Sequence, residues 1–370
     1  MKISMMTKKS FSSLSWKEFF LEDIVTIANG KRLTKIDMSN GNIPFVGASE
    51  MLNGITAFTS TKNESLDKNV LGVNYNGSVG CSFYHPYMAL FSDDVKRVKW
   101  KDSRRNNKYT LLFLASSIMQ QKIKYAYGYK FNSQRMRRQK ILLPVCVDGT
   151  PDWQFMEEFM KEKERLILKT AKEKLNKQLE EQRNNSAAVA DSELVEFKDF
   201  VFGELFSINA SSSGIDKSKL NGNSGHIPYI TRSNVDNAIA DFIGKQNIVL
   251  GRMDEGNVIT IGLDTQSVFY QPKAFYTGQN IQVIRHERLN KYNALYVVEC
   301  IKKLVSKFSW GSYGATLSRL RRGKLYLPVD SSGEPNWDYM EQKSKEVETR
   351  IILKYLNAIN NKYKDEEDNN

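Results

Sequence analysis

Short runs of hydrophobic residues alternate with turn-forming residues over two long stretches of the chain. In residues 16–144 and again in 197–328, β-rich runs such as 69–75 are separated by clusters of Gly, Asn, Ser and Asp. Runs of this kind, bounded by turn residues, are typical of strands. Residues 109–125 and 292–308 instead carry apolar residues at three-to-four spacing, which predicts one helix in each stretch. The pattern therefore predicts two α+β domains.

A different pattern follows each domain. Pro151 and Pro335 indicate a turn, and Asp152 or Asn336 then stands before a Trp, as expected for a helix N-cap. The predicted apolar stripe is formed by Trp153, Met156, Met160, Ile167, Ala171, Leu175 and Leu179 in the first helix, and by Trp337, Met340, Val347, Ile351, Tyr355, Ile359 and Tyr363 in the second. Glu and Lys fill the positions between. Because a helix with one apolar stripe needs a partner, we expect the two helices to pair.

The second half of the chain repeats the first. Residues 149–157 (GTPDWQFME) return at 333–341 as GEPNWDYME, 184 residues later. The basic string at 135–140 (RMRRQK) returns at the same offset at 319–324 (RLRRGK). Two copies that each take about half of the chain are too few and too long for a solenoid. Each copy has the size of one globular domain with an appendage.

The repeat sets the predicted boundaries. They are an N-terminal lead (1–15), a first domain (16–150) with its helix (151–183), a linker (184–196), a second domain (197–334) with its helix (335–364), and an acidic tail (365–370). We expect Trp153 and Trp337 to pack where each helix meets its domain. A helix of about thirty residues spans roughly 45 Å, so paired helices would hold the two domains a fixed distance apart.

Charge and composition narrow the range of partners. Lys and Arg number 54 against 42 Asp and Glu, so the net charge is +12 and the pI is near 9.3, which favours nucleic acid as a partner. Hydrophobic residues make up 41% of the chain, enough for real cores. We find no apolar run of membrane-spanning length and no signal-peptide core at the N-terminus, so we expect a cytosolic protein. Cys81, Cys146 and Cys300 lack Cys-x-x-Cys spacing and fit reduced thiols.

No catalytic motif is evident in the sequence. The Asn/Asp-Pro-Pro-Tyr/Phe motif of amino-methyltransferases is absent, and no Gly-rich loop follows a strand. His85, His226 and His286 have no Ser or Cys partner at a recognisable spacing, and we expect them at the surface or in turns. We therefore expect no catalytic residue, no metal site and no cofactor in this chain.

Two similar domains on a spacer suit double-stranded DNA, whose recognition features recur about every 34 Å on one face. The stretches 42–68 and 225–246 are only loosely alike, which indicates two different half-sites rather than a palindrome. The candidate DNA-binding residues are Lys31, Arg32, Lys35, Tyr127, Tyr129, Lys130, Asn132, Gln134 and Arg135 in the first domain, and Arg232, Asn234, Ser312, Tyr313, Thr316, Ser318 and Arg319 in the second. Arg, Lys, Asn and Gln can pair with base edges, whereas most basic contacts hold phosphates, the role expected for Lys31, Arg32 and Lys35. Arg137, Arg138, Arg321 and Arg322 are alternatively residues that bind a partner subunit.

The ordered repetition resembles a known family. Gly128 or Gly311 leads through a polar segment to Leu-Pro (143–144 and 327–328) and then to Gly-x-Pro-Asp/Asn-Trp-x-x-Met-Glu. Over residues 16–364 this arrangement resembles the specificity (S) subunit of type I restriction-modification systems, including the S-like subunits of BcgI-type systems.

The resemblance implies a non-catalytic subunit that reads DNA through two target-recognition domains. Their helices would form an antiparallel coiled coil with internal pseudo-twofold symmetry and dock DNA adenine methyltransferase subunits. Those partners would bind S-adenosylmethionine, and the nuclease would be another subunit, such as a restriction subunit with translocase activity, or would be fused to the methyltransferase. The alternative is a duplicated scaffold that binds protein or RNA, or an enzyme with an unfamiliar site. A neighbouring gene for an adenine methyltransferase favours the DNA-reading subunit.

Overall fold

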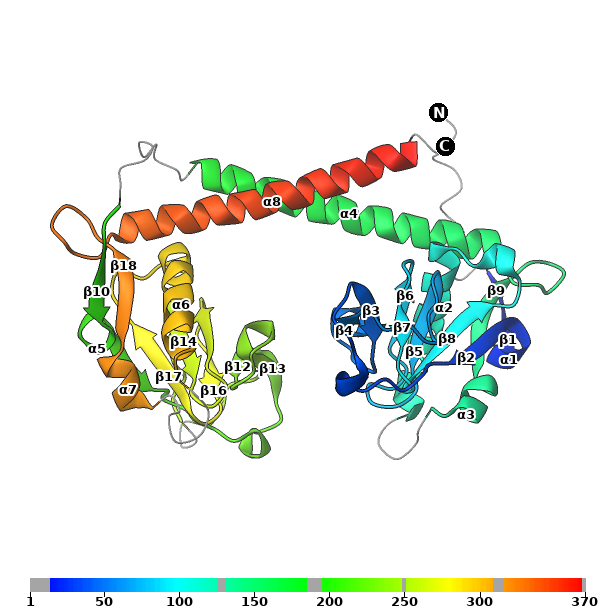
Figure 1. Ribbon diagram of the computed structural model, residues 1–370, viewed down its shortest axis with the longest axis horizontal. Helices are drawn as coiled ribbons and strands as arrows, with labels where there is room; N and C mark the ends of the chain where they lie inside the picture. The colour runs from blue at the N-terminus through cyan, green and yellow to red at the C-terminus, as the bar shows by residue number, and fades with distance from the viewer. Residues whose placement is uncertain (1–13, 126–130, 185–194, 248–250, 309–315, 368–370) are drawn as a thin grey trace. The chain divides into compact units, whose positions relative to one another are not determined.

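The computed structural model describes residues 14–125, 131–184, 195–247, 251–308 and 316–367. The chain divides into two units, Met1–Ala171 and Lys172–Asn370, and the division falls inside one long helix. Each unit contains an α+β domain, coloured from blue to green in the first unit and from green to red in the second (Figure 1).

The first domain is built from two small sheets, a two-stranded ribbon and helices. Its elements in chain order are β1 (Ser15–Phe20), α1 (Leu21–Ile24), β2 (Val25–Asn29), η2 (Lys35–Asp37), β3 (Ile43–Val46), η3 (Leu52–Gly54), β4 (Ile55–Thr59), β5 (Val70–Asn74), β6 (Ser82–His85), β7 (Leu90–Phe91), β8 (Val95–Trp100), η4 (Ser103–Arg105), α2 (Lys108–Met119), η5 (Lys122–Tyr125), α3 (Ser133–Arg137), β9 (Lys140–Val145) and α4 (Trp153–Asn184). One antiparallel sheet has the order β2-β8-β5-β6, and a second has the order β4-β3-β7, with β3 and β7 parallel. β1 pairs with β9 in the ribbon.

The second domain repeats this architecture strand by strand. Its elements are β10 (Phe197–Val201), α5 (Phe202–Leu205), β11 (Ser207–Ala210), η6 (Lys217–Lys219), β12 (Ser224–Ile230), η7 (Asp236–Ala238), β13 (Ile239–Ile243), β14 (Val258–Gly262), β15 (Ser267–Gln271), β16 (Tyr276–Thr277), β17 (Ile281–Arg285), α6 (Lys291–Val305), α7 (Leu317–Arg322), β18 (Lys324–Pro328) and α8 (Trp337–Glu367). The sheet orders are β11-β17-β14-β15 and β13-β12-β16, and β10 pairs with β18. The two tandem α+β domains that the sequence predicts are thus confirmed.

In each domain one helix covers the four-stranded sheet. Leu111, Leu114 and Ile118 of α2 recur at three-to-four spacing and are buried in one cluster with Leu71 and Val98 of the sheet. Burying a side chain of this size stabilises the fold by roughly 1.5–3 kcal/mol. The predicted helix was too long at its end: α2 stops at Met119, and a 3-10 turn follows after two glutamines. Met119 and Gln120 are exposed, so no buried face continues the helix at this point.

In each domain, the residue that caps the covering helix also forms a hydrogen bond to the long helix of the same unit. Asn107 caps α2 by accepting hydrogen bonds from two backbone amides, and its side-chain amide donates to Glu157 of α4 at 3.0 Å. Asn290 caps α6 in the same way and donates to Glu341 of α8 at 2.6 Å. Each N-cap is worth about 1 kcal/mol, and here the same side chain also joins two elements.

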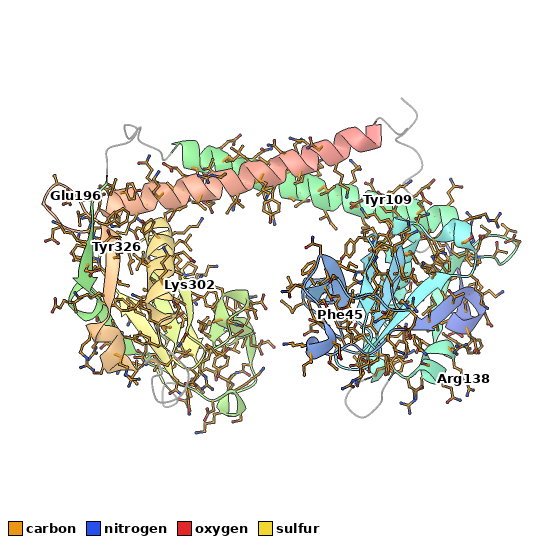
Figure 2. All side chains as sticks on the ribbon, viewed as in Figure 1. Phe45, Tyr109, Arg138, Glu196, Lys302 and Tyr326 are labelled. Atoms are coloured by element: carbon orange, nitrogen blue, oxygen red, sulfur yellow. The ribbon has the colours of Figure 1, made fainter. Side chains whose placement is uncertain are left out.

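An ion pair is repeated about two turns further along each long helix. Lys108 lies 2.6 Å from Glu164 of α4, and Lys291 lies 2.8 Å from Glu348 of α8. The hydroxyl of Tyr109 also donates to Glu164, at 3.1 Å, and Figure 2 shows Tyr109 where α2 meets α4. Since the partially buried pairs stand at equivalent positions, both domains are attached to their helices by the same contacts.

The two tryptophans complete this junction, as the sequence predicts. Trp153 packs edge-on against Trp100 with ring centroids 4.8 Å apart. Trp337 is only 4% exposed and stacks on His286 at 4.4 Å. The predicted N-caps are also confirmed, because the carboxylate of Asp152 and the amide oxygen of Asn336 each accept a hydrogen bond from a backbone N–H three residues later, at 2.9 Å.

The C-terminal part of α4 packs along α8 within the second unit. Leu179 of α4 forms a buried cluster with Ile352 and Leu356 of α8, and the partly buried Leu175 packs against it. Ile359 of α8 is also buried. On α8 the buried positions 352, 356 and 359 alternate four- and three-residue steps, the spacing that keeps a seam on one face of a helix.

The predicted stripe is wrong for several positions. Val347, Ile351 and Tyr355 are about half exposed or more, and Ile167 of α4 is exposed as well. A strict four-residue step turns about 40° further around a helix with 3.6 residues per turn each time, so such a stripe leaves the buried face. The sequence therefore identifies the helices as amphipathic, but the apolar stripe that it predicts lies beside the face that is buried.

Candidate nucleic-acid interface

The loops of the first domain gather at one edge of its four-stranded sheet. β2 ends at Asn29 and β5 at Asn74, whereas β6 begins at Ser82 and β8 at Val95. The register pairs Asn74 with Val95 and places Asn29 beside the next residue of β8, so these strand ends share one edge. We call this edge, with the loops on it, the loop end of the domain.

Three separate loops meet at the loop end of the first domain. The side chain of Asn74 donates to the carbonyl of Ser49 in the β3–β4 loop at 3.0 Å. Lys122, in the segment after α2, lies 3.4 Å from Glu50 of the same loop and 3.4 Å from the sulfur of Cys81 in the β5–β6 turn. The β3–β4 loop, the β5–β6 turn and the segment that leads to α3 thus form one surface.

The second domain brings together the equivalent loops. β11 and β14 end, and β15 and β17 begin, at the corresponding edge. Arg232 of the β12–β13 loop forms an ion pair with Asp264 of the β14–β15 turn, and the hydroxyl of Thr265 donates to the carbonyl of Arg232 at 2.6 Å. Gln266 of that turn donates to the carbonyl of Phe308, after α6, at 2.6 Å.

The predicted phosphate contacts of the first domain start at its loop end. Lys31 and Arg32 directly follow the end of β2, and Lys35 opens the short η2 turn. Lys31 lies 2.8 Å from Glu64, and this hydrogen bond raises the pKa of the Lys31 ammonium group. Arg32 lies 3.9 Å from Asp93. Because these pairs are exposed they stabilise the fold little, and a phosphate can replace the carboxylate at small cost.

Two of the predicted DNA-binding residues have a structural role that the sequence did not assign. The side chain of Asn132 accepts a hydrogen bond from the backbone of Arg135 at 2.9 Å and caps α3. Thr316 accepts from the backbone of Arg319 at 3.3 Å and caps α7. Gln134 and Arg135 on α3, and Ser318 and Arg319 on α7, occupy matching positions on these short helices.

Both short helices lie far from the long helix of their own unit. In Figure 1, α3 lies at the end of the first domain away from α4, and α7 at the end of the second domain away from α8. Figure 2 shows the same separation between Arg138, beside α3, and Tyr109, beside α4. The predicted candidates Tyr127, Tyr129, Lys130, Ser312 and Tyr313 lie outside the described residues.

The remaining candidates divide between exposed and structural residues. Asn234 is exposed in the same β12–β13 loop as Arg232. Arg137, Arg138 and Arg322 are also exposed. Arg321 is exposed too, but it donates to the backbone carbonyl of Ile208 at 2.6 Å and so holds α7 against β11. A role in contacting a partner is therefore a weaker proposal for Arg321 than for the other three arginines.

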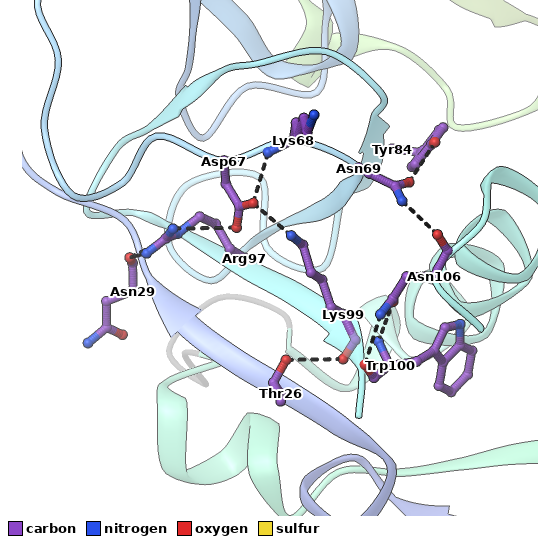
Figure 3. Close-up of polar contacts among 10 residues, drawn as sticks. All are labelled: Thr26, Asn29, Asp67, Lys68, Asn69, Tyr84, Arg97, Lys99, Trp100 and Asn106. Atoms are coloured by element: carbon purple, nitrogen blue, oxygen red, sulfur yellow. Dashed lines mark hydrogen bonds and ion pairs between the residues drawn. The ribbon is translucent and has the colours of Figure 1, made fainter. Parts of the chain in front are cut away.

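A polar cluster that the sequence did not reveal lies on the four-stranded sheet of the first domain (Figure 3), and the second domain repeats part of it. Asp67 accepts from Lys99 at 2.7 Å and from Arg97 at 3.4 Å, so two cations share one carboxylate. In the second domain Asp254 pairs with Arg285 at 2.9 Å. Asp67 and Asp254 are separated by nearly the repeat offset, so the sequence did contain a sign of this repeated cluster. The contacts themselves depend on how β8 pairs with its neighbouring strands, which the sequence does not show.

Asn69 and its counterpart Asn257 occupy the same strained position in this cluster. Asn69 accepts from Tyr84 at 2.8 Å and donates to the carbonyl of Asn106 at 2.6 Å. Asn257 makes the same two kinds of contact, with Tyr270 at 3.0 Å and Leu289 at 2.8 Å. Both have φ near +50° to +56°, a conformation that Asn tolerates better than most residues. The frame of the domain has thus kept its side-chain contacts in both copies.

No catalytic constellation is found within the described ranges. Among those residues there is no group of three His, Cys, Asp or Glu side chains that could hold a metal ion. The three cysteines are free. A cleft of about 400 Å³ beside Ser207, Arg285 and His286, and another of about 270 Å³ beside Arg105 and Trp153, lie toward the long helices and away from the loop ends. No described helix is long and apolar enough to cross a membrane.

The expected placement of the histidines is partly wrong. His85 is fully buried, and desolvation lowers its pKa to about 4. His286 is partly buried under Trp337, and burial lowers its pKa too. His226 is exposed, as expected. A neutral imidazole in an apolar core is a packing residue, so His85 has no place in a polar reactive site.

Fold and site together define a tandem duplication of one α+β domain, in which each copy carries its divergent loops at one end and a long helix at the other. A family model described as "Type I restriction modification DNA specificity domain" matches residues 14–177 and again residues 195–357. The two matches take in most of the chain, which therefore belongs to this family.

The chain is also similar to individual known proteins. The "Type II restriction enzyme BgcI specificity subunit S.BcgI" of Heyndrickxia coagulans is 57% identical over 166 residues, which are 45% of this chain and 48% of that protein. The match thus spans about half the length of this curated relative. Among solved structures, the type I S subunit of M. genitalium superposes with a TM-score of 0.46 at 12% identity, covering 94% of this chain and 93% of that one. The HsdS subunit of Thermoanaerobacter tengcongensis gives a TM-score of 0.32 at 12% identity, with 93% and 90% covered.

Proposed function

We propose that this chain is the DNA sequence-specificity subunit of a restriction-modification complex and recognises a bipartite, asymmetric site in double-stranded DNA. The observation that carries the proposal is a duplicated frame with divergent loop ends, in a chain whose family is that of DNA specificity domains. The frame keeps its caps, ion pairs and tryptophans in both copies. Two domains that share one fold but differ in their loops suit two half-sites of different sequence.

Each loop end is proposed to read one half-site. In the first domain Lys31, Arg32 and Lys35 would hold phosphates, while Gln134 and Arg135 would meet base edges. In the second domain Arg232, Asn234, Ser318 and Arg319 would take these roles. Asn132 and Thr316 would act through the helices that they cap. The net charge of +12 supports a polyanionic partner.

The long helices are proposed to form an antiparallel coiled coil that sets the distance between half-sites. Support comes from the second unit, where residue 182 of α4 contacts 348 and 349 of α8, and Leu179 joins the cluster of Ile352 and Leu356. Later residues of α4 thus contact earlier residues of α8, as expected for antiparallel helices. The functional division would be reading domains at 16–150 and 197–334 with spacer helices at 151–183 and 335–364.

The partners are proposed to be DNA adenine methyltransferase subunits, with a separate or fused nuclease. Apolar side chains stand exposed on the long helices at Leu166, Ile167, Val347, Ile351 and Tyr355, and exposed apolar patches commonly mark protein interfaces. In this proposal the chain is non-catalytic, and S-adenosylmethionine belongs to the methyltransferase. The relative from Heyndrickxia coagulans is itself named as a specificity subunit of a restriction enzyme.

Methylation-aware sequencing of host DNA, with and without this gene, tests the proposal. We expect one two-part motif to carry methyladenine only when the gene is present, with two unlike half-sites and one fixed spacer. An unchanged methylation pattern in a host with an active partner methyltransferase would contradict it and favour the scaffold alternative, which the family assignment does not support.

A further inference from the structure

A polar side chain interrupts the apolar seam between α4 and α8. Gln182 lies three positions beyond Leu179 and is only 6% exposed. Its side-chain carbonyl accepts a hydrogen bond from the hydroxyl of Thr349 at 2.5 Å, and its amide donates to the carboxylate of Glu348. Both groups of this buried amide are therefore used by α8.

The contact continues into the second domain. The other carboxylate oxygen of Glu348 accepts from the ammonium group of Lys291, at the start of α6, at 2.8 Å. Glu348 thus joins α4, α8 and the covering helix of the domain. Charge-assisted hydrogen bonds of this kind are the stronger ones, and a network that is fully satisfied favours one arrangement over others.

The apolar seam alone would accept two registers. Residues 352, 356, 359 and 363 of α8 repeat with alternating four- and three-residue steps and are all apolar or aromatic. A slip of α4 by one heptad toward the C-terminus of α8 would bring Leu179 beside positions 359 and 363, another apolar site. A slip the other way would bring Leu179 beside Lys345 and Thr349, which offer no such site.

Gln182 distinguishes between these registers. In the slipped register it would face Leu356 and lose its bonds to both Thr349 and Glu348. A buried amide without partners is costly, which is how a single polar residue in a coiled coil selects one register. The repeat offset places Glu366 where Gln182 stands and Arg165 where Thr349 stands, so the sequence does not repeat this pair in the other copy.

We infer that Gln182 is a positioning residue that fixes the register of α4 on α8 and so sets the spacing of the half-sites. The inference rests on the proposed function for its effect on DNA. One heptad corresponds to about 10 Å of helix, or about three base pairs. Because each domain precedes its helix and the helices are proposed to run in opposite directions, the slip would move the domains apart and favour a longer site.

The test uses Gln182→Leu in the intact complex, with Gln178→Leu as the control because Gln178 lies exposed on the same helix. Leucine suits either register, so the variant is expected to fold. Spin labels on the exposed positions Lys174 and Lys354, both within the second unit, report the register by pulsed electron resonance. Binding is measured on sites with the wild-type spacer and with spacers three base pairs longer or shorter.

We expect a single distance for the wild type and the control, and a second population shifted by several ångströms for Gln182→Leu. We also expect Gln182→Leu alone to lose about tenfold of its preference for the original spacer over the longer one. A variant with the wild-type distance and the wild-type spacer preference would overturn the inference. If the wild type bound no two-part site, the proposed function would fail, and the spin-label distances would still decide the register.

Discussion

His85 ends β6 and Gln271 ends β15, so the two residues occupy equivalent positions in the two domains. Their hydrogen bonds differ. Gln271 accepts from and donates to Asn237, at 3.2 and 3.1 Å, and holds the β12–β13 turn. His85 is fully buried, and its Nε2 finds no hydrogen-bond partner among the described residues. The folded first domain therefore favours the neutral form of the His85 imidazole over the protonated form.

The free energy of unfolding of the first domain should depend on pH through His85. Its pKa falls from 6.5 to about 4 on burial, so the unfolded chain binds the proton more readily. Stability is full above about pH 6.5 and is lost as the pH falls toward 4, by about 2 kcal/mol at pH 5. Urea denaturation at pH 7 and pH 5 measures it. His85→Gln should remove most of the loss, and the exposed His226→Gln should not; equal pH dependence in both variants would disprove the assignment.

Arg135 and Arg319 occupy equivalent positions on α3 and α7, each three residues after the residue that caps its helix. Arg135→Ala and Arg319→Ala should each weaken binding by about 1–3 kcal/mol and relax selectivity in one half-site only. Binding to sites mutated in one half at a time measures the effect. Arg104→Ala is the control, because Arg104 is exposed in η4 near the long-helix end of the first domain. If both variants kept full affinity, α3 and α7 would not be reading elements.

At the scale of elements, the junction between each domain and its helix depends on one asparagine. Asn290→Ala removes a capping box on α6 and the hydrogen bond to Glu341. We expect the second domain to lose about 1–2 kcal/mol of unfolding free energy, since a cap alone is worth about 1. Thermal or chemical denaturation checks this against Asn234→Ala, an exposed asparagine. Loss of less than about 0.5 kcal/mol would show that the cap is dispensable.

The sequence predicted the elements better than their contacts. The caps at Asp152 and Asn336 and the packing of Trp153 and Trp337 follow from local patterns and were correct. The stripe on α8 was not, because counting apolar residues four apart does not reveal which face meets a neighbour. Ile352 and Leu356, on the buried face, stand one position beyond the chosen Ile351 and Tyr355.

The candidate site could be predicted only in part for a similar reason. Basic residues after β2 and before β9 were visible as charged strings, but their common location depends on strand pairing over long distances in the chain. The meeting of Ser49, Asn74 and Lys122 joins three loops that no local pattern connects. The caps formed by Asn132 and Thr316 were missed because each precedes a helix of only five or six residues.

At the level of the whole chain, the two proposed reading domains should bind DNA largely through phosphate contacts. With six or more such contacts, affinity should fall about a thousandfold or more between 50 and 200 mM salt. Filter binding or fluorescence anisotropy across this range measures the slope. Lys31→Ala should reduce the slope by about one unit without changing the preferred sequence. A slope near zero would exclude phosphate contacts as the main source of affinity.

The proposed role of the long helices is to set the distance between two half-sites. Its most direct test is to insert seven residues, one heptad of similar sequence, between Ala171 and Lys172 and to map the methylated sites. The insertion lengthens α4 by about 10 Å while keeping the face that meets α8. We expect the same two half-site sequences, separated by a spacer about three base pairs longer. The same half-sites at the original spacing would contradict it.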